Sequence, residues 1–144
     1  MAQVSTYLNF DRCTEEAFNF YKSVFGTEFD NLTRHSDVPL PEGAPGPSEE
    51  DKNLIINVAL PILGGHILMG TDAPESMDFK VKQGNNFFIC LHPDTRSESD
   101  ALFAALSAGG KVENPLQEMF WGDYWGSLVD KFGIQWMVNC SSKT

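Results

Sequence analysis

Residues 4–26 read VSTYLNFDRCTEEAFNFYKSVFG, a strand that runs directly into a helix, and this stretch decides the fold. Strict alternation over the first seven of these residues predicts a strand with Leu8 and Phe10 on its apolar face. The opposite face carries Ser5, Tyr7 and Asn9.

The helix is expected to begin near Asp11 and Thr14, because both residue types favour helix starts. Two acids follow in the first turn, where negative charge suits the helix dipole. Gly26 is the expected C-terminal cap. The apolar residues recur at helical spacing: Ala17, Phe18, Tyr21, Val24 and Phe25.

Three further strands are expected in the first half. An edge strand is predicted over 27–33, and a β-prone run covers 54–60. The Gly64-Gly65 turn joins that run to a strand over 66–70, which is typical of a hairpin. Residues 36–51 (SDVPLPEGAPGPSEED) contain four prolines and five acids, so we expect a solvated, mobile loop there.

The second half follows the same order. After a connection over 71–84, a buried strand is predicted over 86–91. A helix is then expected to start at Ser97 or Ser99 and to end at Gly109-Gly110. The last three strands are expected at 111–113, 124–129 and 134–140, with a turn at Phe132-Gly133.

Strand, helix and three strands therefore occur twice. The two helices align at an offset of 84 residues, which places Gly26 against Gly110, and the proline-rich loop accounts for the extra length of the first half. We predict one α+β domain over 1–144, built from two βαβββ modules at about 1–80 and 85–141.

Composition excludes several classes of function. The 144 residues carry 10 basic and 20 acidic side chains, and a net charge of −10 repels the phosphates of nucleic acids. No apolar run approaches the roughly 20 residues of a membrane span, and the first ten residues do not read as a signal peptide. Three distant cysteines (Cys13, Cys90 and Cys140) favour reduced thiols, so we expect a cytoplasmic protein.

The paired modules resemble the vicinal oxygen chelate fold of glyoxalase I, extradiol dioxygenases and bleomycin-resistance proteins. Four segments are similar to its PhnB-like branch: YLNF at 7–10, AFNFYKSVFG at 17–26, EMFW at 118–121 and DKFGIQWMV at 130–138. The resemblance spans both halves. It implies a curled, mostly antiparallel sheet around a cavity, with modules paired within one chain or across a homodimer.

Metal-dependent relatives place one ligand, commonly His or Glu, on each of four strands. The resemblance puts these positions at Ser5, Asn57, Asn86 and Met137. Neutral amides and a thioether poorly replace imidazole or carboxylate around a divalent metal. We therefore expect no metal and no other cofactor, and a divalent metal is the disfavoured alternative.

The remaining donors have simpler interpretations. His35 adjoins the acidic loop and is expected at the surface, and His92 precedes Pro93 in a turn. His66 begins a hairpin strand; a structural role is the first interpretation, and the cavity mouth is the alternative. Cys90 is expected to pack in the core.

Residues 117–126 (QEMFWGDYWG) concentrate four aromatic rings beside two carboxylates. Such a segment suits the rim of a pocket that stacks on a flat ligand, or alternatively core or interface packing. Glu118 is the best candidate for a general base, because aromatic surroundings raise the pKa of a carboxyl group.

The face of each sheet away from its helix is expected to line the cavity. On the last strand, Trp136 and Val138 are expected beneath the helices, which leaves Gln135, Met137 and Asn139 inward. The predicted ligand-binding residues lie on these inward faces or at the rim: Tyr7, Asn9, Asn57, Asn86, Glu118, Trp121, Trp125 and Met137.

The leading hypothesis is a homodimeric protein that binds a small apolar or aromatic molecule without a metal. One alternative is an enzyme, either a metal-dependent lyase, isomerase or dioxygenase acting through His66 and Glu118, or a metal-free enzyme with Glu118 as base. Another is a dimer whose cavity is filled by its own side chains. The scattered glycines argue against a Rossmann-type methyltransferase.

Overall fold

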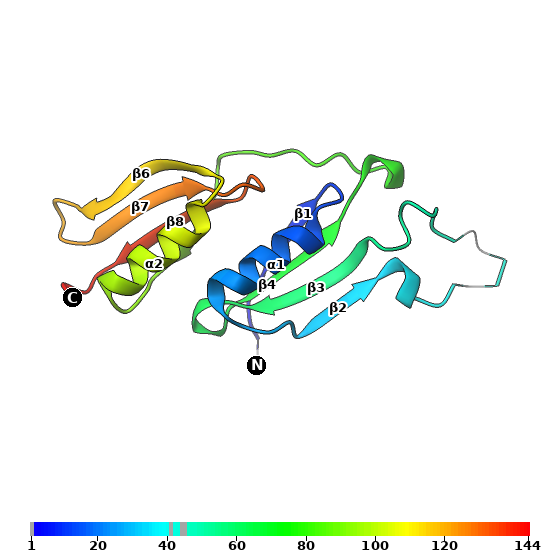
Figure 1. Ribbon diagram of the computed structural model, residues 1–144, viewed down its shortest axis with the longest axis horizontal. Helices are drawn as coiled ribbons and strands as arrows, with labels where there is room; N and C mark the ends of the chain where they lie inside the picture. Colours follow the sequence, from blue (N-terminus) through cyan, green and yellow to red (C-terminus); the bar gives the residue numbers. More distant parts are fainter. Residues whose placement is uncertain (1, 41, 44–45) are drawn as a thin grey trace. The chain divides into compact units, whose positions relative to one another are not determined.

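The computed structural model describes residues 2–40, 42–43 and 46–144 (Figure 1). The chain divides into two compact units, Met1–Val81 and Lys82–Thr144. Each unit is a four-stranded sheet with one α-helix, so the two units have the same architecture.

The described residues of the first unit form one α-helix, which lies between the first two strands. Its sheet has the order β1-β4-β3-β2, in which β1 and β4 are parallel and the other pairs are antiparallel. The elements are β1 (Thr6–Phe10), α1 (Thr14–Phe25), β2 (Asn31–Arg34), β3 (Ile55–Pro61) and β4 (Ile67–Asp72), with short 3-10 helices at His35–Asp37, Leu63–Gly65 and Glu75–Met77.

The second unit repeats this plan in the order β5-β8-β7-β6, with β5 and β8 parallel. Its elements are β5 (Ile89–Leu91), α2 (Arg96–Ser107), β6 (Lys111–Glu118), β7 (Tyr124–Val129) and β8 (Gln135–Cys140). The prediction of an α+β fold made of two βαβββ modules is therefore confirmed. The bounds of a single domain over 1–144 stay a prediction.

The core of the first unit lies between α1 and its sheet. Phe18 and Tyr21 of α1 are fully buried, with their rings edge to face at 5.5 Å. Gly70 of β4 lies under Phe18, and a Cβ atom at Gly70 would come within 2.5 Å of Phe18 Cε1. Only glycine lets the helix pack this closely.

The core of the second unit contains a buried polar anchor. Trp136 of β8 is fully buried, and its Nε1 donates a hydrogen bond of 2.9 Å to Asp130 Oδ2. The other oxygen of Asp130 accepts from the backbone N–H groups of Phe132 and Ile134. This carboxylate therefore fixes the predicted Phe132-Gly133 turn, where Gly133 has φ of 89°.

The predicted start of the second helix was wrong. Thr95 is the N-cap of α2, and its side chain accepts a hydrogen bond of 3.0 Å from the backbone N–H of Glu98, so neither Ser97 nor Ser99 holds this position. The pattern T95-R-S-E98 is the expected spacing for such a cap. Glu98 also accepts from the backbone N–H of Asp94.

Several strand boundaries differ from the prediction. β2 begins at Asn31 instead of residue 27. β5 begins at Ile89, so Asn86 precedes the strand. β6 continues to Glu118 instead of ending at 113. The prediction that Cys90 packs in the core was also wrong, because its side chain is exposed.

The acidic loop has one buried end. Its described residues form no strand, but Asp51 is only 7% exposed. Its carboxylate pairs with Arg12 at 2.8 Å and accepts from the Ser76 hydroxyl at 3.1 Å. The prediction of a solvated loop was therefore wrong at this end, and residues 41 and 44–45 lie outside the described residues.

Candidate functional site

Gly70 distinguishes the two faces of the first sheet. In the strand register, Gly70 is the neighbour of Leu8 and of Val58, and it touches α1. Because side chains alternate along a strand, the adjacent row of Tyr7, Met69 and Ala59 faces away from α1.

The face away from α1 carries no charged side chain among the described strands. Asn9 pairs with Thr71, and Thr33 pairs with Asn57, in the row next to Tyr7 and Met69. The residues on this face are Tyr7, Asn9, Asn31, Thr33, Asn57, Ala59, Pro61, Ile67, Met69 and Thr71. Three of the predicted ligand-binding residues, Tyr7, Asn9 and Asn57, are therefore brought to one surface.

The second sheet has an equivalent face, and we use the term uncovered face for the side of each sheet that lies away from its own helix. A Cβ atom at Gly126 would come within 2.9 Å of Phe103 of α2, so Gly126 and its neighbour Val138 face the helix. The alternate positions, among them Met137 with Ser127 and Asn139 with Trp125, face away from it.

The inward positions on β8 lie on the face expected for them, but their exposure differs. Gln135 is 8% exposed, and its Nε2 donates a hydrogen bond of 2.6 Å to the carbonyl of Phe87. Asn139 donates to Asp123 Oδ2 at 3.0 Å. The face away from α2 therefore carries Trp125, Met137 and amides that already have partners.

Glu118 lies on the other side of this sheet. It pairs across the strands with Tyr124, whose hydroxyl donates a hydrogen bond of 2.6 Å to Asp100 of α2. That hydrogen bond raises the pKa of Tyr124. The contact with α2 places Tyr124, and with it Glu118, on the helix side.

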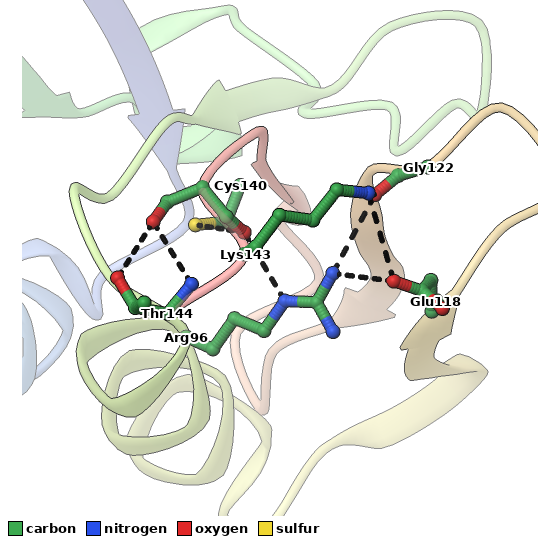
Figure 2. A network of polar contacts seen from close by, with 7 residues as sticks. Arg96, Glu118, Gly122, Cys140, Lys143 and Thr144 are labelled. Carbon is green, nitrogen blue, oxygen red and sulfur yellow. Dashed lines mark hydrogen bonds and ion pairs between the residues drawn. The ribbon is translucent and has the colours of Figure 1, made fainter.

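The carboxylate of Glu118 belongs to a network of polar contacts (Figure 2). Arg96 at the start of α2 donates to Glu118 Oε1 at 2.9 Å, and Lys143 Nζ lies 3.7 Å from the same oxygen. The hydrogen bond from Arg96 holds the pKa of Glu118 below its ordinary value. The expectation of a raised pKa was therefore wrong, because the nearest groups are cations.

The same network holds the aromatic turn that follows β6. Arg96 Nε donates to the carbonyl of Ser142 at 3.1 Å, and Lys143 donates to the carbonyl of Gly122 at 2.8 Å (Figure 2). Phe120 and Trp121 project from this turn, 96% and 52% exposed, with rings edge to face at 4.8 Å. Trp121 therefore lies in a turn next to these contacts, outside the strands of the sheet, and its role at the rim stays a prediction.

The positions corresponding to metal ligands carry neutral groups. Ser5 donates its hydroxyl to Met69 Sδ at 3.6 Å, and Asn57 and Met137 lie on the uncovered faces of their sheets. The ring of His66 hydrogen-bonds to the hydroxyl of Thr6 at 2.8 Å. Within the described ranges, no group of three or more His, Cys, Asp or Glu side chains could hold a metal ion.

A family model described as 3-demethylubiquinone-9 3-methyltransferase matches residues 2–139. The chain belongs to this family. Its members include PhnB-like proteins, and the structural neighbours place the fold in the glyoxalase/bleomycin resistance/dioxygenase superfamily.

Several relatives match more than nine tenths of the chain. Protein PA1353 from Pseudomonas aeruginosa is 31% identical, with a TM-score of 0.82 over 97% of this chain and 98% of that chain. A Bacillus cereus protein described as a PhnB protein, and assigned by its description to the same methyltransferase family, is 26% identical. Its TM-score is 0.72 over 96% of this chain and 99% of that chain. Protein YjdN of Escherichia coli is 27% identical over 94% of this chain and 93% of its own.

More distant neighbours share the fold alone. The fosfomycin resistance protein of Listeria monocytogenes is 9% identical, with a TM-score of 0.66 over 99% of this chain and 94% of that chain. The mixed four-stranded sheets differ from the doubly wound parallel sheet of a Rossmann-type methyltransferase. In the part of the chain that is described, no helix is long and apolar enough to cross a membrane.

Proposed function

We propose that this protein binds a small apolar or aromatic molecule on a sheet face that lies away from the helix, without the metal used by other members of the superfamily. The observation that supports this most is the lining of the first face. It combines an aromatic ring, a thioether, amides and hydroxyls, and its described strands supply no charge.

The absence of charge from these strand positions is unusual for a sheet face in contact with water. A sheet face that stays in water usually carries polar and charged side chains. Tyr7 and Met69 on one sheet, and Trp125 and Met137 on the other, instead resemble the lining of a ligand pocket. Neutral amides among them would orient a ligand without needing a counter-ion.

The geometry gives little support to catalysis by Glu118. Its carboxylate is already paired with Arg96 and lies on the helix side of its sheet. A pKa below the ordinary value also makes a weaker base. Glu118 as the base of a metal-free enzyme therefore stays an untested prediction, and its contacts favour a role in holding the turn.

The homodimer and the cytoplasmic location belong to the same proposal. Phe120 and Trp121 form an exposed aromatic pair that an interface would cover. Cys13, Cys90 and Cys140 all lie in the described part of the chain and form no disulfide, in keeping with a reducing compartment. Light scattering during gel filtration tests the dimer, and a mass of 16.0 kDa would contradict it.

The binding proposal is tested by thermal shift with a panel of neutral aromatic compounds. A ligand at about 100 times its Kd stabilises the native state by roughly 2.7 kcal/mol, so the melting temperature should rise. Tyr7→Ala and Met137→Ala should reduce that rise, whereas Val4→Ala, at a position 83% exposed before β1, should not.

Two results would contradict the proposal. One is a panel that leaves the melting temperature unchanged. The other is one equivalent of zinc, nickel, iron or manganese in protein purified without a chelator, because the proposed site uses no metal.

A further inference from the structure

The two uncovered faces use their amide groups differently. On the second sheet, Asn114 Nδ2 donates to Ser127 Oγ at 2.9 Å, Asn139 donates to Asp123 and Gln135 donates to a backbone carbonyl. These three amides form hydrogen bonds with other groups of the protein. Each has used one of its two N–H donors within the protein.

On the first sheet, the side chains of Tyr7, Asn9 and Asn57 form no hydrogen bond within the described residues. Tyr7 is 50% exposed, and the hydroxyl and both amides retain their full capacity to donate and to accept. The second sheet has one comparable amide, that of the exposed Gln117 opposite Trp125 on the edge strand β6, so the free hydrogen-bonding groups of this side are more numerous on the first sheet.

These free groups are arranged in order across the strands. Asn9 of β1 pairs with Thr71 of β4. Because Val58 pairs with Gly70 in the antiparallel register, the next step places Asn57 of β3 beside Thr71. Asn9 and Asn57 are therefore two strands apart, about 10 Å, with one hydroxyl between them.

An apolar row runs beside this polar row. Tyr7 pairs with Met69, and Met69 pairs with Ala59, two residues along each strand from the polar row, which is about 7 Å. A flat ring can lie on these side chains while its polar edge reaches the amides. The separation of about 10 Å suits a ligand of two fused rings.

We propose that the first sheet provides the polar recognition of the ligand, and that the ligand is a neutral, planar, two-ring molecule with an amide-like edge. This inference rests on the proposed function and narrows it. A carboxylate or phosphonate would lose hydrating water on this face, and the strands provide no cation to replace that water. A neutral amide would instead exchange its hydrogen bonds with water for hydrogen bonds with Asn9 and Asn57.

The test compares two probes of the same shape, 2-naphthamide and 2-naphthoate, at pH 7. We expect 2-naphthamide to bind at least tenfold more tightly by calorimetry. In ¹⁵N–¹H spectra it should shift the side-chain amide signals of Asn9 and Asn57. Asn9→Ala or Asn57→Ala should weaken binding at least fivefold.

Asn114→Ala is the matched control, because it removes an amide from the uncovered face of the second sheet, where the amide already has a partner. It should leave the affinity for 2-naphthamide unchanged. Asn9 is exposed, so Asn9→Ala remains informative if Asn57→Ala does not fold.

The outcomes separate this inference from the proposed function. Equal or tighter binding of 2-naphthoate, or signal shifts at Asn114 and Asn139 instead of Asn9 and Asn57, would overturn the inference while leaving small-molecule binding in place. Failure of both probes to bind at millimolar concentration would also overturn it. The thermal-shift panel then decides whether the broader proposal survives.

Discussion

Gly70 controls the distance between α1 and the first sheet. Gly70→Ala would place a Cβ atom 2.5 Å from the ring of Phe18, which is buried and cannot turn away. We expect a loss of about 1–3 kcal/mol in the free energy of unfolding. Urea denaturation measures it.

Gly84→Ala is the matched control, because the nearest atom to its Cβ would be 3.8 Å away. It should change the free energy of unfolding by less than about 0.5 kcal/mol. Equal effects of the two substitutions would mean that Gly70 is not a close-approach position.

The alternation of buried and exposed residues in β1 could be predicted from the local sequence. The lowered pKa of Glu118 could not. Leu8 and Phe10 are buried as expected, because alternation is a local property of a strand. Glu118 meets Arg96, which is 22 residues away in the chain, and local aromatic composition gives no sign of that contact. The expected base was thus assigned from its neighbours in sequence rather than in space.

Arg96 connects three segments of the second unit: the start of α2, the turn at 119–123 and the last residues of the chain. Arg96→Ala should lower the free energy of unfolding by about 1 kcal/mol, since part of the side chain is in solvent. It should also broaden the indole signal of Trp121 in NMR spectra by releasing the turn.

Lys131→Ala is a suitable control, because it removes a cation from the turn between β7 and β8, away from the turn at 119–123. Its effect on the signal of Trp121 should be negligible. An unchanged Trp121 signal in Arg96→Ala would show that the network does not hold the aromatic turn.

Element types were predicted more reliably than element ends. The apolar pair Phe87 and Phe88 continues the pattern of a strand, yet β5 starts only at Ile89. β6 extends through Pro115 because it is an edge strand, where a missing N–H group is tolerated. Both boundaries depend on neighbouring strands that a local pattern does not include.

Stability at acidic pH should reflect three carboxylates. Hydrogen bonds from Arg34 and Arg96 lower the pKa of Glu15 and Glu118 respectively. Burial raises the pKa of Asp51, but the hydrogen bonds from Arg12 and Ser76 together lower it by more than burial raises it. The pKa of Asp51 therefore also lies below its ordinary value.

A carboxyl group with a lowered pKa in the folded state stabilises the fold above its unfolded pKa, about 4. That stability is lost as the pH falls through the folded pKa. Urea denaturation from pH 7 to pH 3 should therefore show the free energy of unfolding falling below about pH 4.5.

Glu15→Gln should make that fall shallower. Glu16→Gln should leave it unchanged, because Glu16 has no ion pair in the described part of the chain. Identical pH profiles for the wild type and Glu15→Gln would mean that Arg34 does not stabilise the charged form of Glu15.

The repeated βαβββ order could be predicted for the whole molecule, because both halves carry the same sequence of strand and helix patterns. The burial of Asp51 could not, because Arg12 and Ser76 come from segments far along the chain. Likewise, the free amides of the first sheet became distinguishable from the bonded amides of the second only in the structure.

The most direct measurement of the central claim is a crystal structure of the protein purified from cells without a chelator. We expect organic density on the face that carries Tyr7, Met69 and Asn57, with no anomalous metal signal. A metal ion held by side chains, or a face closed by the protein's own residues, would contradict it.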